Sequence, residues 1–164
     1  MIQGQIQAAR HNGAYLLRLV GDVRVTLCAT FDDFLDKMFA DKAFVSVNID
    51  LCQAEGIDST SLGLLAKLAI QAQQKFALTP VIFSSNASIT RIIDSMGFDA
   101  VFDIRHYAPN QEPEVEALPQ VNLSEGEVCK KVVEAHRILM GMNDDNKAKF
   151  CDLVDVLERQ CSFD

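Results

Sequence analysis

The hydrophobic residues of the first third of the chain follow two different periodicities. In residues 2–8, apolar or small side chains alternate with glutamines, which is typical of a half-buried strand. His11-Asn12-Gly13 predicts a tight hairpin, because Asn-Gly accepts a positive φ at both turn positions. Residues 15–20 have the pattern of the returning strand. From about Thr26 the apolar positions recur every three or four residues, which predicts a helix.

The next stretch alternates strand and helix patterns. The predicted elements are a strand at 45–51, a loop through Gly56, a helix from 58–61, a strand at 81–83 after Pro80, a helix capped by Ser88 and ended by Gly97, and a strand at 100–104. An initial hairpin followed by such alternation favours right-handed parallel crossovers. We therefore expect an α/β domain whose mixed sheet starts with an N-terminal hairpin and carries its helices mainly on one side.

A change of composition separates this domain from the C-terminal part. Residues 108–123 contain three of the four prolines, interleaved with glutamates, and predict an extended linker. Ser124-Glu125-Gly126-Glu127 has the form of a capping box, and apolar stripes on both sides of Gly141-Met142-Asn143 predict an α-helical hairpin over 124–162. Two helices bury too little to be stable alone. We expect the hairpin to lie on the first domain, on a second copy in a homodimer, or on a partner.

Charge narrows the classes of function. The 164 residues carry 23 acidic and 15 basic side chains, a net charge of −8, and they contain no Lys/Arg run. Such a chain lacks the electrostatic footprint of a nucleic-acid-binding protein. Because no apolar run is long enough for membrane insertion and no signal peptide opens the chain, we expect a cytoplasmic protein. The excess of negative charge is unevenly distributed, because the net charge is −2 in residues 1–109 and −6 in residues 110–164.

Cysteine and histidine spacing gives no sign of a metal or cofactor. The five cysteines are odd in number and form no CxxC pair, so we expect neither a disulfide framework nor a zinc site, but small buried residues in a reducing compartment. His11, His106 and His136 are scattered without ligand spacing. We expect no metal and no cofactor.

The most informative cluster is Asp58-Ser59-Thr60-Ser61-Leu62-Gly63, at the junction of a loop and a helix. One interpretation is ordinary capping, in which an oxygen of the cluster accepts a hydrogen bond from the first turn. The other is phosphorylation. A hydroxyl at an exposed helix N-terminus is a suitable acceptor, because the helix dipole and free N–H groups tolerate a phosphate there.

This cluster resembles a known signature. Val47-Asn-Ile-Asp-Leu51 followed by Ile57-Asp58-Ser59-Thr60-Ser61-Leu62-Gly63 is similar to the central motif of STAS domains, the fold of bacterial anti-sigma factor antagonists. Gly21-Asp22 resembles the loop after the second strand of that family, and residues 89–102 resemble its third helix and last strand. The resemblance covers about residues 5–105, and we place a STAS-like domain at 1–107.

The resemblance implies a set of functional residues. The serine directly after the aspartate of the motif is the residue phosphorylated in that family, which assigns the switch to Ser59. The family usually has glycine where this chain has Ser61, so Thr60 and Ser61 remain alternative acceptors. The residues expected to shape the acceptor loop or to bind partners are Asp22, Arg24, Asp58, Thr60, Ser61 and Leu62.

The implied activity is partner switching, not catalysis. The expected partners are an anti-sigma factor with serine kinase activity and a serine phosphatase, two activities that one response regulator can combine. An alternative is a STAS regulatory subunit of a membrane transport or stress-sensing assembly. An enzyme is not expected, because no phosphate-binding loop, nucleophile elbow or Ser/His/Asp arrangement occurs in the sequence.

His136 raises one further hypothesis. Ala135-His136 and the following leucine weakly resemble a histidine phosphotransfer helix, but the lysine and small residues of that motif are absent. Two helices also cannot make its four-helix bundle. We therefore expect His136 to face solvent on an amphipathic helix.

Overall fold

The computed structural model describes residues 2–110 and 113–161 and contains a mixed sheet. Its strands are β1 (Gln5–His11), β2 (Ala14–Val23), β3 (Ser46–Asp50), β4 (Ala54–Ile57), β5 (Val81–Phe83), β6 (Asp103–Arg105) and β7 (Glu116–Ala117). They are ordered β6-β5-β3-β2-β1-β7, and β4 also pairs with β2. The hairpin pair β1–β2 is antiparallel, while β2, β3, β5 and β6 run parallel. The predicted mixed sheet with an N-terminal hairpin is confirmed.

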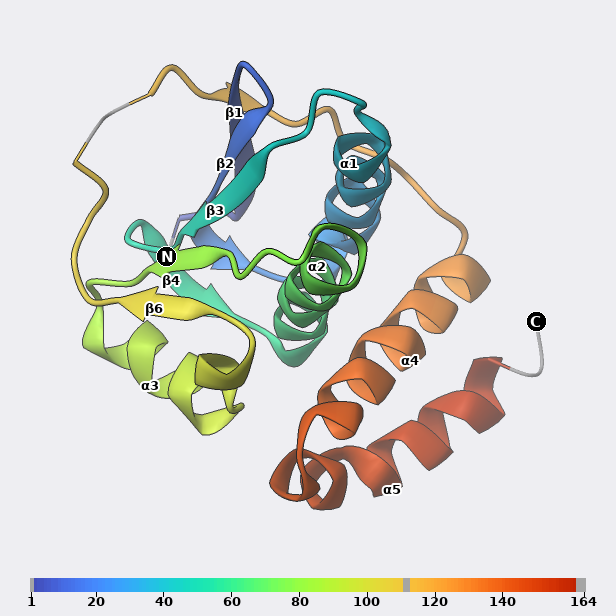
Figure 1. Cartoon of the computed structure of the whole chain (residues 1–164). Coiled ribbons are helices and arrows are strands. Elements are labelled where there is room, and N and C mark those ends of the chain that lie inside the picture. Colours follow the sequence, from blue (N-terminus) through green and yellow to red (C-terminus); the bar gives the residue numbers. More distant parts are fainter. Residues whose placement is uncertain (1, 111–112, 162–164) are drawn as a thin grey trace.

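Five α-helices and two short 3₁₀ helices complete the described chain. The α-helices are α1 (Cys28–Ala40), α2 (Ser59–Phe76), α3 (Ala87–Ser95), α4 (Glu125–Met142) and α5 (Asp144–Cys161), and the 3₁₀ helices span Val25–Leu27 and Phe98–Ala100. Figure 1 shows α1 and α2 side by side next to the sheet, with α4 outside them and α5 furthest out. Helix α2 therefore forms the middle layer, between the sheet and the C-terminal hairpin.

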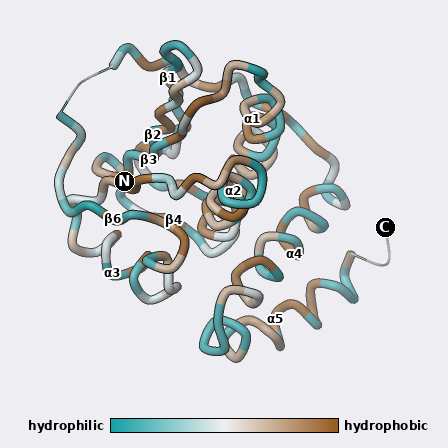
Figure 2. The backbone as a smooth tube through the Cα atoms, viewed as in Figure 1, coloured by the Kyte–Doolittle hydropathy of each residue, from teal (hydrophilic) through white to brown (hydrophobic). Residues whose placement is uncertain are grey.

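Hydrophobic burial explains this arrangement. Hydrophobic residues recur along the strands and α2 (Figure 2), and ten of the residues of α2 are buried. A helix that is apolar over most of its surface must be covered on more than one side. The sheet covers one side of α2, and α4 covers another, through buried residues that include Ala135 and Leu139. Of the three locations open to the hairpin, the structure shows it on the first domain.

The β1–β2 turn forms as predicted. Asn12 and Gly13 have φ values of 52° and 84°, so both turn positions are left-handed. A Cβ atom on Gly13 would lie 1.8 Å from the carbonyl oxygen of Ala43. Glycine is required here both by its φ and by the closeness of the next chain segment.

Several predicted boundaries differ from the structure. Residues 54–57 form strand β4 where a loop was expected, because a four-residue strand that contains a glycine has little periodicity. The cap of α3 is Asn86, whose side chain accepts from the Ser88 N–H at 2.8 Å, and not Ser88 itself. Gly97 ends the helix as predicted, with φ 79°. The last strand lies at 103–105, because residues 98–100 first form a 3₁₀ turn.

The predicted linker is partly a strand. Within residues 108–123, β7 pairs with the outer edge of β1, and the Leu118 N–H donates to the Ile6 carbonyl at 2.9 Å. The edge of β1 offers unpaired main-chain groups, which attract any extended segment that passes. Residues 111–112 of the linker, like residue 162 at the predicted end of the hairpin, lie outside the described residues.

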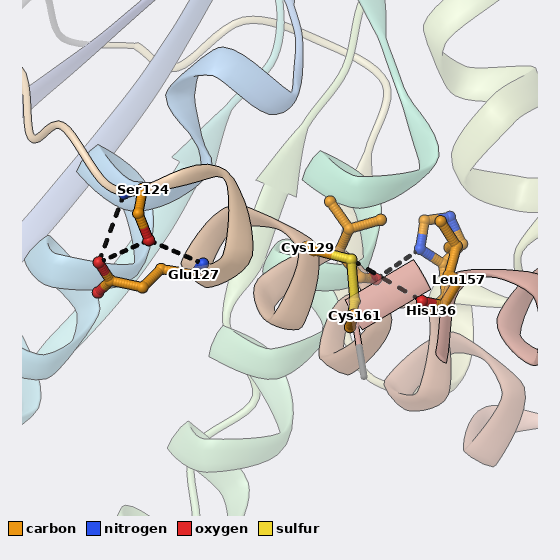
Figure 3. Close-up of a disulfide and its surroundings, with 7 residues drawn as sticks. Ser124, Glu127, Cys129, His136, Leu157 and Cys161 are labelled. Carbon is orange, nitrogen blue, oxygen red and sulfur yellow. Dashed lines mark hydrogen bonds between the residues drawn. A yellow bond between two sulfur atoms is a disulfide. The ribbon is translucent and has the colours of Figure 1, made fainter. Parts of the chain in front are cut away.

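The helical hairpin is capped as predicted but also cross-linked. Ser124 and Glu127 form the capping box, with the Glu127 N–H donating to Ser124 Oγ at 3.2 Å (Figure 3). Cys129 and Cys161 form a disulfide, so the expectation of five unpaired cysteines is wrong for these two. The antiparallel helices bring the start of α4 to the end of α5, a proximity that a separation of 32 residues hides in the sequence.

Candidate functional site

Asp58 is the N-cap of α2, which confirms the capping interpretation of the cluster. Its Oδ1 accepts from the Ser61 N–H at 2.9 Å, and its Oδ2 accepts from the Val25 N–H at 2.7 Å. One carboxylate therefore caps α2 and ties its first turn to the segment that leads into α1. Asp58 thereby fixes the loop that precedes α2, by satisfying donors from two elements.

The three hydroxyls of the cluster have different environments. Ser59 is the first residue of α2 and is half-buried. Thr60 and Ser61 are each only 5% exposed, and Leu62 belongs to the hydrophobic core. Ser59 is thus the member of the cluster that reaches the outer surface of the domain.

That outer surface is occupied by α4. Ser59 Oγ lies 2.8 Å from Nε2 of His136, and Nδ1 of the same ring lies 2.7 Å from the Val132 carbonyl oxygen. Because a carbonyl only accepts, Nδ1 carries a hydrogen and donates it. In the neutral ring Nε2 is then an acceptor, and the Ser59 hydroxyl donates to it.

His136 is buried, contrary to the expected solvent-facing position. It is 2% exposed, and its ring packs edge-on against Phe150 of α5 at a centroid distance of 5.2 Å. Figure 3 shows the ring on α4, on the same hairpin as the disulfide. A serine hydroxyl bound to an imidazole is also the arrangement of a nucleophile and its base. Here the ring is fixed by a main-chain carbonyl and covered by Phe150, so the pair acts as a contact between two elements.

The helices approach closely next to this pair. A Cβ atom on Gly63 of α2 would lie 2.3 Å from the carbonyl oxygen of Ala135 and 2.7 Å from its Cβ. These are main-chain and Cβ atoms, which no rotamer change can move. Gly63, the last residue of the motif, is therefore the position that lets α4 lie directly on α2.

A buried ion network lies across the same interface. Asp32 of α1 is 4% exposed, and its carboxylate binds Lys131 of α4 and, at 2.8 Å, Lys67 of α2. Lys67 also binds Glu134 of α4 at 2.5 Å. The network joins α1, α2 and α4 and runs from the buried carboxylate of Asp32 to the exposed side chain of Glu134.

The pKa values of this network reflect the pairing. Burial by itself raises the pKa of Asp32, but the hydrogen bonds from Lys131 and Lys67 outweigh it, and the net pKa lies below the ordinary value. Burial lowers the pKa of Lys67, but its hydrogen bonds to Asp32 and Glu134 raise it above the ordinary value. Both groups are held in their charged forms.

The turn of the hairpin makes a second contact with the domain. Asn146 and Asn143 both donate side-chain N–H groups to the Met96 carbonyl at the end of α3, at 2.9 and 3.3 Å. A Cβ atom on Gly97 would lie 2.6 Å from Nδ2 of Asn143. The hairpin is thus anchored at α2 and at α3.

The other predicted partner-binding residues lie beside the acceptor loop. Asp22 and Arg24 form an ion pair with each other at 2.8 Å, and the hydrogen bond to Asp22 raises the pKa of Arg24. They stand at the end of β2, which pairs with β4 just before Asp58. The structure brings both residues to the same end of the sheet as Ser59.

The ion network and the buried position of His136 were not predicted from the sequence. Lys67 gave one signal of the network in the sequence, because it is the only charged residue between Ser59 and Gln74. A lone lysine in such a run indicates a buried carboxylate partner. Asp32 and Lys131 gave no comparable signal, because charged residues surround them in the sequence.

Comparison with protein families matches residues 5–112 to the STAS domain. The chain therefore belongs to the STAS domain family, whose members are typically non-catalytic regulatory domains. The match includes β1 to β6 and α1 to α3, and the α4–α5 hairpin lies outside it. No curated protein matches the chain significantly.

No helix within residues 2–110 or 113–161 is both long and apolar enough to cross a membrane. In the same residues, no cluster of three or more His, Cys, Asp or Glu side chains is arranged to hold a metal ion.

Proposed function

We propose that this protein is an anti-sigma factor antagonist that acts by partner switching, with Ser59 as the phosphorylated switch. The observation that carries the proposal is the position of Ser59 in a STAS domain. It follows the capping Asp58 directly and is less buried than Thr60 and Ser61. A kinase needs a hydroxyl that it can reach, which favours Ser59 over its two neighbours.

Because Ser59 is the first residue of α2, the helix can stay folded when Ser59 is phosphorylated. A phosphate on the first residue of a helix faces the positive end of the helix dipole and the free N–H groups of the first turn. The domain fold would persist while its surface charge changes. Residues 1–109 have a net charge of −2, so a phosphate of about −2 roughly doubles the negative charge of the domain.

The charge change would act on partner binding. Unphosphorylated, the surface around Ser59, with Asp22, Arg24 and Asp58 nearby, would bind an anti-sigma factor and free its sigma factor. Phosphorylated, the same contact would have to bury a dianion next to Asp58, which costs several kcal/mol without a matching cation. About 3 kcal/mol is already more than a hundredfold in affinity. The anti-sigma factor would be the serine kinase, and a serine phosphatase would reset the switch in the cytoplasm.

The test begins with capture of the protein's partners. The full chain is used as bait in extracts of its native cell, and bound proteins and the 59–61 peptide are analysed by mass spectrometry. An anti-sigma factor, together with phosphate on Ser59, is the expected result. Recovery of a membrane transport or stress-sensing assembly with an unmodified Ser59 would instead favour the alternative role of a STAS regulatory subunit.

Affinity measurements then test the switch itself. Ser59→Asp should weaken binding of the captured anti-sigma factor at least a hundredfold, while Ser59→Ala should bind at least as tightly as the wild type. Ser88→Asp is the matched control, because Ser88 is an exposed serine near the start of α3 in the same domain. Equal dissociation constants for the two Ser59 variants would exclude the proposal.

A further inference from the structure

The α4–α5 hairpin covers the part of the domain that carries Ser59. The Ser59 hydroxyl donates to His136, and Gly63, four residues further along α2, meets the main chain of Ala135. Any protein that must reach Ser59 along this face of α2 meets α4 first. We propose that the hairpin is an autoinhibitory occupant of the switch surface, latched to Ser59 by His136, that must open before the anti-sigma factor or its kinase activity reaches Ser59 and that phosphorylated Ser59 keeps from closing again. This inference rests on the proposed role of Ser59.

Hydrogen-bond chemistry makes the latch and the phosphate incompatible. In the neutral ring, with the Nδ1 hydrogen directed at the Val132 carbonyl, Nε2 of His136 is the acceptor and the hydroxyl of Ser59 is the donor. Phosphorylation removes that donor and places acceptor oxygens against an acceptor nitrogen. Because His136 is 2% exposed and packs against Phe150, its ring has little access to water that could separate it from the phosphate while the hairpin stays in place.

The charges of the interface oppose a phosphate as well. Lys67 and Lys131 lie on this interface, and both already bind the carboxylate of Asp32. Lys67 is further engaged by Glu134 of α4. Residues 110–164 carry a net charge of −6, so a phosphate on the domain repels the segment that covers it.

The hairpin can leave as one body. The Cys129–Cys161 disulfide joins the start of α4 to the end of α5, and Arg137 binds Glu158 across the two helices. Segment 108–123 would keep the released hairpin tethered to the domain. A tethered hairpin competes with a partner at a high effective concentration. The partner's apparent affinity then falls in proportion to the open fraction of the protein.

Gly63 lets docking of the hairpin be weakened without a change at His136. Gly63→Ala places a Cβ atom against the main chain of α4, while alanine favours the helical conformation of α2 itself. The substitution therefore opposes docking without opposing the domain. Gly141→Ala is the matched control, because it adds the same methyl group to α4 at a place where no atom lies within 4 Å.

The first readout is access to position 59. The full chain carrying Ser59→Cys is alkylated with iodoacetamide, and peptide mass spectrometry separates position 59 from the free Cys28, Cys52 and Cys151. Adding Gly63→Ala should speed the reaction at position 59 at least tenfold, and adding Gly141→Ala should leave it unchanged. Equal rates with and without Gly63→Ala would overturn the claim that the hairpin masks the site.

The second readout is release by phosphate. Phosphoserine is installed at position 59 by genetic encoding, and hydrogen–deuterium exchange is followed in the intact chain. Exchange in α4 should rise at least tenfold while β1–β3 and α2 keep their protection, which shows that the domain stays folded. Unchanged exchange in α4 would overturn the release step. Because no partner protein is used, either failure would leave partner switching at Ser59 standing, and failed partner binding would leave the latch standing.

Discussion

Ser59 Oγ and His136 Nε2 lie 2.8 Å apart, although 77 residues separate them in the sequence. The pair joins the central motif of the STAS domain to a helix that lies outside the family match. It also gives the C-terminal hairpin a specific contact with the candidate switch, in addition to its hydrophobic packing. The following predictions test this interface and the elements that hold it.

His136→Ala should weaken docking of the hairpin. The substitution removes the acceptor of the Ser59 hydroxyl and the ring contact with Phe150. The loss of such a partly buried hydrogen bond costs about 1–3 kcal/mol. Exchange of α4 amides should therefore rise by about tenfold or more. Arg137→Ala, at the next residue of α4, removes only an exposed ion pair with Glu158 and should change exchange little.

Asp32→Asn should weaken the packing of α4 on the domain by disrupting the ion network between α1, α2 and α4. It removes the buried carboxylate that binds Lys131 and Lys67 and leaves two ammonium groups with fewer partners. Breaking a buried charge pair in this way costs about 3 kcal/mol. Asp33→Asn is the control, since Asp33 binds Lys37 on the exposed side of α1. Denaturant unfolding that is equal for the two variants would show that the network adds nothing to stability.

Acid should remove the contribution of Asp32. Burial raises its pKa, but the hydrogen bonds from Lys131 and Lys67 prevail, and the folded pKa lies below the ordinary 3.8. A lowered folded pKa gives stability that is complete above the unfolded value and is lost as the pH falls through the folded value. The difference in unfolding free energy between the wild type and Asp32→Asn should be constant from pH 5 to 7 and shrink below about pH 4. A difference that stays constant down to pH 2 would contradict this account.

Reduction of the Cys129–Cys161 disulfide should loosen the hairpin but not the STAS domain. In the chain-entropy view, a cross-link that closes about 30 residues contributes about 3–4 kcal/mol. Cys161→Ser should therefore raise exchange at the end of α5, while β1–β3 keep their protection. Cys151→Ser, which changes an unpaired cysteine of α5, should behave like the wild type. Loss of protection in the sheet would mean that the hairpin and the domain unfold together.

Local signals predicted most of the domain. The Asn12-Gly13 turn, the Gly97 helix end and the Ser124–Glu127 capping box all formed as expected, because each depends on residues close together in the chain. The wrong element boundaries also come from the reliance on local signals. Strand β4 is too short for a periodic pattern, and Asn86, two residues before the expected Ser88, is an equally suitable cap residue.

In the candidate site, too, the features that depend on neighbouring residues were predicted and the long-range contacts were not. The sequence pointed to Asp58 as a loop-shaping residue and to Ser59 as a hydroxyl at the start of a helix, since both roles depend on an N-cap and its first turn. The sequence did not show that α4 would cover Ser59. The apolar stripe of the hairpin was visible, but a stripe fits a domain, a second copy or a partner equally well.

The sequence by itself determined most of the order of the elements, the mixed α/β fold, the hydroxyl cluster at the start of a helix and the acidic C-terminal helical hairpin. Only the tertiary structure decided that His136 is buried on Ser59, that Asp32 meets Lys131 across 99 residues, and that Cys129 meets Cys161. Periodicity and capping are properties of neighbouring residues. Which helix face covers which surface depends on shape, and here it depends on Gly63, whose missing side chain lets α4 lie directly on α2 next to Ser59.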